Sequence, residues 1–282
     1  MILFIYRLVP AGLKPYHPNT KSHIGKEYLM ADTLQNKIQS LQQIIDTYDN
    51  IVFFGGAGVS TESGIPDFRS TDGLYHMQYA YPPETIVSHS FYRANPKEFY
   101  RFYKDKMIYP DAVPNNAHKK LAELEARGKV RAVITQNIDG LHQAAGSKEV
   151  LELHGSVLRN YCEHCGTFHD VYAVINSPDV PRCTACGGPV KPDVVLYEEG
   201  LDDKILRSAI RYIQNAQVLI IGGTSLAVYP AAGLIDYFQG EKIVVINKTA
   251  TPRDSFADLL IQAPIGEVFA ALHRSPADAA CK

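Results

Sequence analysis

The sequence predicts an α/β fold, in which a doubly wound parallel sheet is interrupted by a small cysteine-rich module and by a second, helical insertion. Three observations favour this fold. Short, unbroken apolar runs alternate with stretches of helical periodicity, which is typical of parallel sheets that are covered on both faces. Glycine-rich turns follow two of these runs, and four of the five cysteines fall into two close pairs.

The composition of the chain limits the classes of function. The 282 residues are 46% hydrophobic and 21% charged, which is enough to bury one large domain or two smaller ones. The formal net charge of −2 supplies no general attraction to nucleic acid or to anionic lipid. The longest apolar run, residues 1–6, is far shorter than the roughly 20 residues that span a bilayer, and it lacks the features of a signal peptide. We therefore expect a cytoplasmic protein that binds neither nucleic acid nor membranes directly, and we favour a monomer.

The two ends of the chain are expected to lie outside the domain. Residues 1–29 contain three prolines and little periodicity, which predicts a disordered leader. After residue 30 apolar residues recur at helical spacing, among them Ile38, Leu41 and Ile45, so the domain is expected to begin there. Residues 273–282 are predicted to form a tail.

Six short apolar runs are predicted to be the strands of the parallel sheet. They are Ile51–Phe54, Val130–Ile134, Val150–Leu153, Val218–Ile221, Ile243–Ile246 and Leu259–Ile261. The sheet domain is accordingly expected to comprise residues 30–156 and 197–272. Within it, residues 64–115 are rich in aromatic residues and prolines and form the expected helical insertion, whereas the Pro-rich and Gly-rich residues 157–196 form the cysteine-rich module.

The cysteine pairs predict one structural zinc ion. The four ligands would be Cys162, Cys165, Cys183 and Cys186. Two residues separate the members of each pair and 17 separate the pairs, which matches the spacing of a four-cysteine zinc site. The alternatives are two disulfides, which a reducing cytoplasm disfavours, and four buried free thiols, which the clustering disfavours. Because four sulfurs complete a tetrahedral shell, we interpret His164 and His169 in the same module as surface residues.

Two glycine-rich turns point to a phosphate-containing ligand. Residues 55–64 follow the first strand, and residues 222–225 follow the fourth. Glycines at strand ends let backbone N–H groups approach a phosphate closely, although a tight structural turn would need the same residues. Thr61 breaks the strict dinucleotide pattern of three glycines, but two such turns suit a dinucleotide at the switch point of a doubly wound sheet. Asn247, after the fifth strand, is placed to address a ribose or the adenine.

Polar residues also crowd the ends of the second and third strands. Gln136, Asn137 and Asp139 follow the second strand, and His154 follows the third. Buried amide and carboxylate groups are costly without partners, so a polar ligand is a reasonable cause for this density. A lone histidine at a strand end is more often a satisfied core residue, but His154 belongs to the same series of strand ends.

Several long motifs occur together and in one order along the chain. They are residues 56–69 (GAGVSTESGIPDFR), 135–142 (TQNIDGLH), 153–155 (LHG), the four cysteines, 191–197 (KPDVVLY) and 223–226 (GTSL). This set resembles the sirtuins, the NAD-dependent protein lysine deacylases, and more closely their bacterial members. The resemblance covers about residues 34–270.

The resemblance implies a large Rossmann-like domain and a smaller zinc-ribbon domain, with NAD and an acylated lysine in the cleft between them. In the chemistry of this family the amide oxygen of the acyl-lysine attacks the ribose carbon as nicotinamide leaves. His154 would be the catalytic general base, since an imidazole can accept a proton near neutral pH. The cofactor-binding residues would be Gly56, Ala57, Gly58, Thr61, Asp67, Phe68, Arg69, Gln136, Asn137, Ile138, Asp139, Gly223, Thr224, Ser225, Asn247 and Glu267. The substrate-binding residues would be Val194, Val195, Leu196 and Tyr197, on a strip to which a substrate backbone adds as a strand.

Three positions depart from the commonest pattern of the family. They are Lys191 in place of Arg, Asp193 in place of Asn and Glu198 in place of Gly, and the last is expected to lie beside the substrate entry. Family members that prefer succinyl or malonyl groups share a Tyr-x-x-Arg pair, for which this chain has Tyr103 and Lys106. A Lys ammonium cannot grip a carboxylate through two parallel donors, so we expect a preference for neutral acyl groups such as acetyl.

The function expected from the sequence is NAD-dependent removal of acetyl groups from protein lysine, with NAD as co-substrate and an acetylated protein or peptide as partner. The products would be nicotinamide, O-acetyl-ADP-ribose and deacetylated lysine. One alternative is a protein ADP-ribosyltransferase, which would use the same NAD pocket with a different acceptor. The other is a non-catalytic NAD-binding regulatory module, which the presence of His154 and of the polar cluster at residues 136–139 disfavours.

Overall fold

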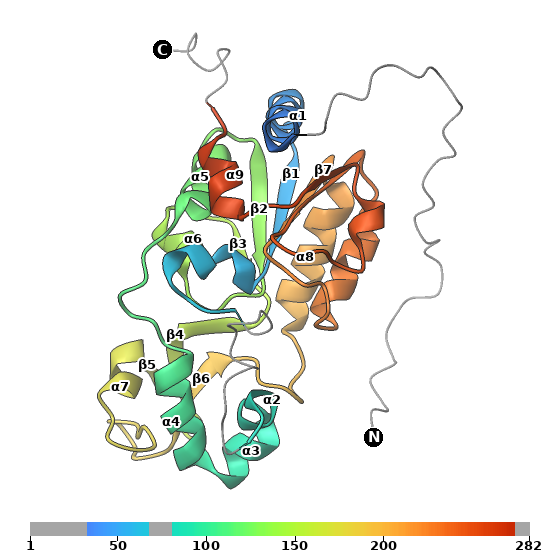
Figure 1. Cartoon of the computed structure of the whole chain (residues 1–282). Helices are drawn as coiled ribbons and strands as arrows, with labels where there is room; N and C mark the ends of the chain where they lie inside the picture. Colours follow the sequence, from blue (N-terminus) through green and yellow to red (C-terminus); the bar gives the residue numbers. More distant parts are fainter. Residues whose placement is uncertain (1–32, 68–80, 274–282) are drawn as a thin grey trace, which may run out of the picture.

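The protein has two lobes of unequal size, as the computed structural model in Figure 1 shows. The structure describes residues 33–67 and 81–273. The predicted leader, almost all of the predicted tail, and the predicted cofactor-binding residues Phe68 and Arg69 lie outside the described residues. Within the described ranges, no helix has both the length and the apolar composition needed to cross a membrane.

The large lobe is built on a six-stranded sheet in which every pair of neighbours is parallel. Its strands are β1 (Ile51–Gly55), β2 (Val130–Thr135), β3 (Val150–Glu152), β7 (Val218–Gly222), β8 (Lys242–Ile246) and β9 (Leu259–Ile261). Their order is β3-β2-β1-β7-β8-β9, so the chain winds outward in both directions from the central pair. The six predicted strands and the doubly wound topology are confirmed. The switch point falls between β1 and β7, where a doubly wound sheet binds its ligand.

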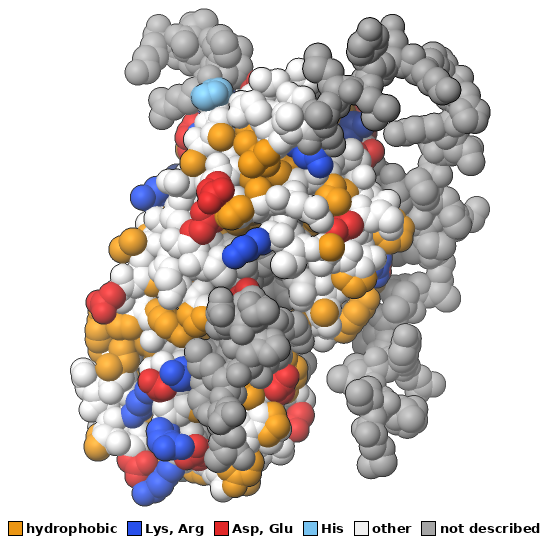
Figure 2. Space-filling view, viewed as in Figure 1, with side chains coloured by type: hydrophobic (Ala, Val, Ile, Leu, Met, Phe, Trp, Pro, Cys, Tyr) orange, Lys and Arg blue, Asp and Glu red, His pale blue; other side chains and the backbone are white. Residues whose placement is uncertain are grey.

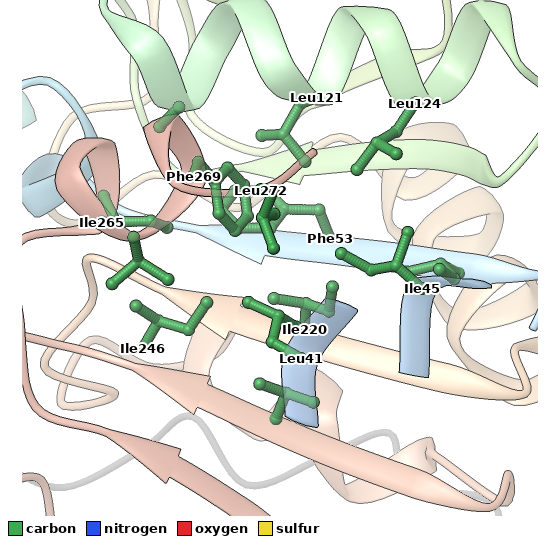
Figure 3. Packing of buried hydrophobic residues seen from close by; sticks show 14 of the residues in the cluster. Leu41, Ile45, Phe53, Leu121, Leu124, Ile220, Ile246, Ile265, Phe269 and Leu272 are labelled. Atoms are coloured by element: carbon green, nitrogen blue, oxygen red, sulfur yellow. The ribbon is translucent and has the colours of Figure 1, made fainter. Parts of the chain in front are cut away.

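Helices cover both faces of this sheet. On one face lie α1 (Leu34–Thr47), α5 (Asn116–Ala126) and α9 (Ile265–Ala270), and on the other lie α8 (Asp203–Asn215) and the 3-10 helix η4 (Ala231–Tyr237). Successive side chains of a strand point to opposite faces of the sheet. Phe53 therefore packs in the core beneath α1, α5 and α9, and Phe54 packs in the core beneath α8 and η4. Figure 3 shows Phe53 surrounded by Leu121 of α5 and Phe269 of α9. The unbroken apolar runs therefore result from burial on two faces.

The small lobe combines the two predicted insertions. Its antiparallel sheet has the order β5-β4-β6, from the strands β4 (Gly155–Cys162), β5 (Phe168–His169) and β6 (Val190–Val194). Its helices are α2 (Pro83–Ile86), α3 (His89–Ala94), α4 (Pro96–Lys106) and α7 (Val171–Ile175). Four aromatic residues of α4, among them Phe99 and Tyr103, share one core with Val157 of β4 and Val194 of β6. The helical insertion and the cysteine-rich module are thus one packed unit, which lies below the large lobe in Figure 1.

Charged side chains on this lobe are largely paired. Lys97 contacts Asp179 at 2.6 Å, and Arg101 pairs with Glu98 one turn away on α4. Figure 2 shows positive and negative side chains side by side on the lower part of this face. Such mixed charge adds no strong field of one sign, in line with the small net charge of the chain.

Candidate active site

A cavity of about 1200 Å³ lies between the two lobes, at the carboxyl ends of the central strands. Two short 3-10 turns, η1 (Ala57–Val59) and η2 (Thr61–Ser63), follow β1 and form part of its wall. We call residues 56–64 the cofactor loop. The second glycine turn, after β7, forms the facing part of the wall through residues 223–225. Both turns that the sequence singled out thus lie at the switch point.

The two glycine turns pack backbone against backbone. Gly58 N donates a hydrogen bond to Gly223 O at 2.8 Å, and a Cβ atom built on Gly58 would lie 2.8 Å from Gly223 Cα. Gly223 itself has a φ of +59°, and its own Cβ would lie 2.3 Å from Val59 N. Neither position has room for a side chain. The absence of side chains here lets a diphosphate approach the backbone of the two turns closely, so the shape of the site fits a dinucleotide.

A hydrogen-bonded group of polar side chains fixes the next part of the wall. Ser60 Oγ donates to Asp139 Oδ2 at 2.6 Å and accepts from Asn137 Nδ2 at 3.0 Å. The other carboxylate oxygen of Asp139 accepts from Leu141 N at 2.9 Å. Because a carboxylate oxygen can accept a further hydrogen bond, Asp139 remains able to bind a donor in the cavity. Ser60 was missing from the predicted site, although its place between two predicted residues of the glycine motif was a usable signal.

Asn247 supports the second glycine turn. Its Oδ1 accepts from Thr224 N and its Nδ2 donates to Thr224 O, both at 2.9 Å. Thr224 Oγ1 in turn accepts from Gln136 Nε2 at 3.1 Å. The amide of Asn247 therefore holds the turn that carries Thr224, in addition to lining the cavity. Its neighbour Lys248, which the sequence did not single out, lines the cavity as well.

His154 lies between the lobes, directly before β4. Its Nδ1 lies 2.9 Å from Gln136 O, and a carbonyl oxygen can only accept, so Nδ1 carries the proton. Nε2 therefore keeps its lone pair. Burial lowers the pKa of His154 below 6.5, against the opposite effect of the hydrogen bond to Gln136, so the ring is neutral at pH 7. A half-buried, neutral histidine with a free lone pair on the wall of a cavity is suited to accept a proton.

An ion triad ties the two lobes together beside His154. Arg159 of β4 contacts Glu152 of β3 through Nη1 and Asp193 of β6 through Nε, each at 2.7 Å. Glu152 belongs to the large sheet and is almost fully buried. Asp193, one of the three departures from the family pattern, thus has a charged partner in this chain.

The other two departures also have partners. Lys191 Nζ lies 3.2 Å from Glu199 Oε2, and Glu199 also contacts His89 Nδ1 at 2.8 Å. Glu198 has a φ of +77°, an unfavourable value for a residue with a side chain, and its carboxylate accepts from Ser90 N and Ser90 Oγ at 2.8 and 2.9 Å. The strained backbone at Glu198 is therefore offset by two charge-assisted hydrogen bonds to the start of α3.

The predicted substrate strip, residues 194–197, lines the cavity next to these acidic residues. Its backbone is already engaged within the chain, because Val195 N donates to His154 O and Tyr197 N donates to Val87 O, both at 3.0 Å. These bonds hold the strip against β4 and the segment before α3, and β6 is an edge strand of the small sheet.

The four cysteines converge at the far end of the small lobe. Their sulfur atoms all lie within 4.8 Å of one another, with Sγ distances of 3.4 Å from Cys162 to Cys186 and 3.6 Å from Cys165 to Cys183. Zinc bonds of about 2.3 Å in a tetrahedron place sulfurs about 3.8 Å apart, so the cluster fits one zinc ion. All four thiols are free, so the disulfide alternative does not apply to this structure.

One prediction in this module is wrong. His164 is exposed as predicted, but His169 is only 7% exposed and its ring approaches Cys183. The reason is strand pairing: His169 lies opposite Asn160 in the β4–β5 ladder, which turns its side chain inward. The local sequence carries no sign of this pairing.

Nearly all predicted cavity residues that the structure describes line the same cavity. The exception is Glu267, which is exposed on α9, whereas Pro264 and Ile265 just before it reach the cavity. Sequence reasoning also missed Tyr229, which lines the cavity after the second glycine turn. Tyr103 of α4 lines the cavity too, and its fully buried Oη has no hydrogen-bond partner within the described residues.

Comparison with known proteins agrees with this arrangement. A sequence model of the Sir2 family matches residues 56–230. An NAD-dependent protein deacetylase of Clostridium perfringens is 60% identical over 238 residues, which are 83% of this chain and 98% of that protein. An NAD-dependent protein deacetylase of Clostridium acetobutylicum is 57% identical over 238 residues, which are 83% of this chain and 97% of that protein. A solved Sir2 structure with a p53 peptide and NAD+ is 40% identical, has a TM-score of 0.74, and corresponds to 83% of this chain and 95% of that chain. Since the family match spans more than half of the sequence and the relatives align over nearly their whole length, the chain belongs to the Sir2 family.

Proposed function

We propose that this protein is an NAD-dependent protein lysine deacetylase, which converts an acetylated lysine, NAD and water into lysine, nicotinamide and O-acetyl-ADP-ribose. The observation that carries the proposal is the position of His154, a neutral histidine with a free Nε2 lone pair in the cavity that the two glycine turns form. Relatives with the name NAD-dependent protein deacetylase support the same reaction. So does a solved Sir2 complex with a deacetylated p53 peptide and 3′-O-acetyl ADP ribose.

His154 acts as the general base in this proposal. Bound NAD supplies the ADP-ribose group that accepts the acetyl group. His154 Nε2 takes a proton from a ribose hydroxyl, and the hydrogen bond from Nδ1 to Gln136 O keeps the ring in the tautomer that can do so. The ion triad around Arg159 keeps β3 and β6 together on either side of this histidine.

The polar wall binds and orients the cofactor. Gly58 and Gly223 leave room for the diphosphate because neither has a side chain, and Asp139, held by Ser60, accepts a hydrogen bond from the carboxamide. The remaining predicted cofactor contacts of the two turns are proposed to act with them, including Phe68 and Arg69 outside the described residues. The wall formed by residues 194–197 accommodates the aliphatic part of the acetylated lysine, since Val194 and Leu196 are apolar and nearly buried.

The four cysteines hold one structural zinc ion. Cys162 and Cys183 lie in the core of the small lobe next to Val190, so the ion would join β4 to the turn that precedes β6. We place the protein in the cytoplasm, where reducing conditions keep the four thiols available for zinc. Its partner would be an acetylated protein or peptide.

The proposal is tested by incubation of the purified protein with NAD and an acetyl-lysine peptide, followed by mass analysis of the products. The expected result is a peptide that is lighter by one acetyl group, together with nicotinamide and O-acetyl-ADP-ribose. A peptide that gains ADP-ribose would identify an ADP-ribosyltransferase instead. Binding of NAD without turnover would leave only a regulatory module and would contradict the proposal.

A further inference from the structure

Asn115 lies next to the cofactor loop but does not line the cavity. Its Nδ2 donates to Val59 O at 2.7 Å and to Ser63 Oγ at 3.0 Å. Val59 and Ser63 are the last residues of η1 and η2, the two turns that carry Ala57 and Thr61 into the cavity wall. Any effect of Asn115 on a ligand must therefore pass through the loop.

The other end of Asn115 is anchored to the core of the large lobe. As the N-cap of α5, its Oδ1 accepts from Ala117 N at 2.9 Å, and its backbone N donates to His118 Nδ1 at 3.3 Å. His118 is fully buried, and burial lowers its pKa to about 4, so Nδ1 keeps the lone pair that this bond requires. Leu121 and Leu124 of the same helix pack into the core around Phe53, as Figure 3 shows.

The cofactor loop depends on such contacts for its shape. Each of its two turns is only three residues long, and 3-10 turns of this length have little stability of their own. Two other contacts fix the loop. Ser60 Oγ donates a hydrogen bond to Asp139, and the carboxylate of Glu62 accepts a hydrogen bond from Gly266 N at 2.6 Å. The Nδ2 group of Asn115 is the contact that joins both turns to one rigid helix.

We infer that Asn115 is a positioning residue for NAD: its amide holds the two turns of the cofactor loop at the spacing that the dinucleotide requires. This inference rests on the proposed function, because it takes NAD as the ligand of the loop. Loss of the donor leaves the carbonyl oxygen of the buried residue Val59 without this partner and removes the contact that ties both turns to α5. We expect the affinity for NAD to fall by roughly 5- to 100-fold, which corresponds to the loss of a hydrogen bond to a buried group.

Two substitutions separate the capping of α5 from the support of the loop. Asn115→Asp keeps an oxygen for the N-cap but has no donor for Val59 O, and Asn115→Ser keeps a capping hydroxyl that is too short to reach the loop. Ser63→Ala is the matched partner, since it removes one acceptor of Nδ2 and leaves the cap of α5 untouched. Calorimetric titration gives Kd for NAD, and steady-state kinetics give KM separately for NAD and for an acetyl-lysine peptide.

Both Asn115 variants should melt within a few degrees of the wild type, bind NAD more weakly, and show an unchanged KM for the peptide. Ser63→Ala should show the same pattern to a smaller extent. A wild-type Kd for NAD in both Asn115 variants would overturn the inference. A lower melting temperature together with equal increases in KM for NAD and for the peptide would also overturn the inference, because Asn115 would then have a general structural role. If the wild-type protein itself shows no NAD binding in the same titration, the proposed function fails, and the inference fails with it.

Discussion

The contact between the two glycine turns leads to a quantitative prediction for Gly58→Ala. The added methyl group would lie 2.8 to 3.0 Å from three backbone atoms of Gly223. Gly223 cannot retreat easily, because it accepts from Gly58 N at 2.8 Å and donates to Ile246 O at 3.1 Å. The methyl group must therefore push the two turns apart at the point where the diphosphate is proposed to bind.

The size of this effect follows from two contributions. Overpacking by one methyl group against an unyielding neighbour costs about 1 to 3 kcal/mol. Loss of the hydrogen bond from Gly58 N to Gly223 O adds about 1 kcal/mol. A total of about 2 to 4 kcal/mol corresponds to a decrease in melting temperature of roughly 5 to 15 °C for a domain of this size.

Differential scanning calorimetry and titration with NAD provide the measurement. Gly200→Ala is the control, since a methyl group at Gly200 would meet no atom within 4 Å and should leave both quantities nearly unchanged. Gly58→Ala should lower the melting temperature and weaken NAD binding by more than tenfold, on the scale of about 1.4 kcal/mol for each factor of ten. If both glycine variants melt at the same temperature and bind NAD equally well, the close packing of the turns does not constrain the site.

The further predictions concern the chemistry, the substrate entry, the acyl group and the metal. His154→Ala should slow deacetylation roughly 100- to 10,000-fold while NAD binding is retained, as single-turnover assays and titration will measure. Because burial lowers the pKa of His154, the acidic limb of kcat/KM for the wild type should lie below pH 6.5, and a limb at higher pH would contradict this. Glu198→Ala should lower the free energy of unfolding by about 1 to 3 kcal/mol, because it loses the hydrogen bonds to Ser90 and keeps the strained φ. Glu198→Gly should recover most of this loss, since glycine adopts a positive φ without strain. Equal melting temperatures of the two variants would refute the argument. The wild type should prefer acetyl over succinyl peptides in a competition assay, because the Lys106 ammonium is paired with Asp105 at 3.0 Å and cannot grip a carboxylate through two parallel donors. Lys106→Arg should raise the turnover of succinyl peptides. Cys186→Ser should lower the zinc content measured by metal analysis and the melting temperature together, so a variant with full zinc content would contradict the assignment.

Local sequence patterns predicted the sheet, the two glycine turns and the polar strand ends of the cavity, whereas the family resemblance supplied most of the other individual site residues. Apolar runs in strands such as β1 end at polar or glycine-rich turns, and parallel strands bring their carboxyl ends to one edge, so residues far apart in sequence were expected to meet. The cofactor loop and His154 lie at that edge as a result. Glu267 was expected in the site only from the family resemblance, and it lies on α9 two residues after Ile265, which lines the cavity, with its own side chain exposed.

Contacts between segments without a shared pattern were not predictable in this way. The inward orientation of His169 depends on the register of the β4–β5 ladder, which no feature of the two strands specifies. The bond from Ser90 to Glu198 joins residues that are 108 positions apart and needs the tertiary fold to bring them together. Periodicity reports which face of an element is buried, but it does not report what covers that face.

The shared core of the small lobe has a consequence for how the chain folds during synthesis. Helix α4 exposes four large aromatic side chains until β4 and β6 cover them, and β6 ends 88 residues after α4. At about 5 to 20 residues per second, a ribosome needs roughly 4 to 18 seconds to supply the missing strands. During that time the four aromatic side chains of α4 lack the strands that bury them in the folded protein, so their apolar surface is exposed to water. Strands β7, β8 and β9 follow β6 in the chain, so every strand and helix of the small lobe has been synthesised before the large sheet can be completed.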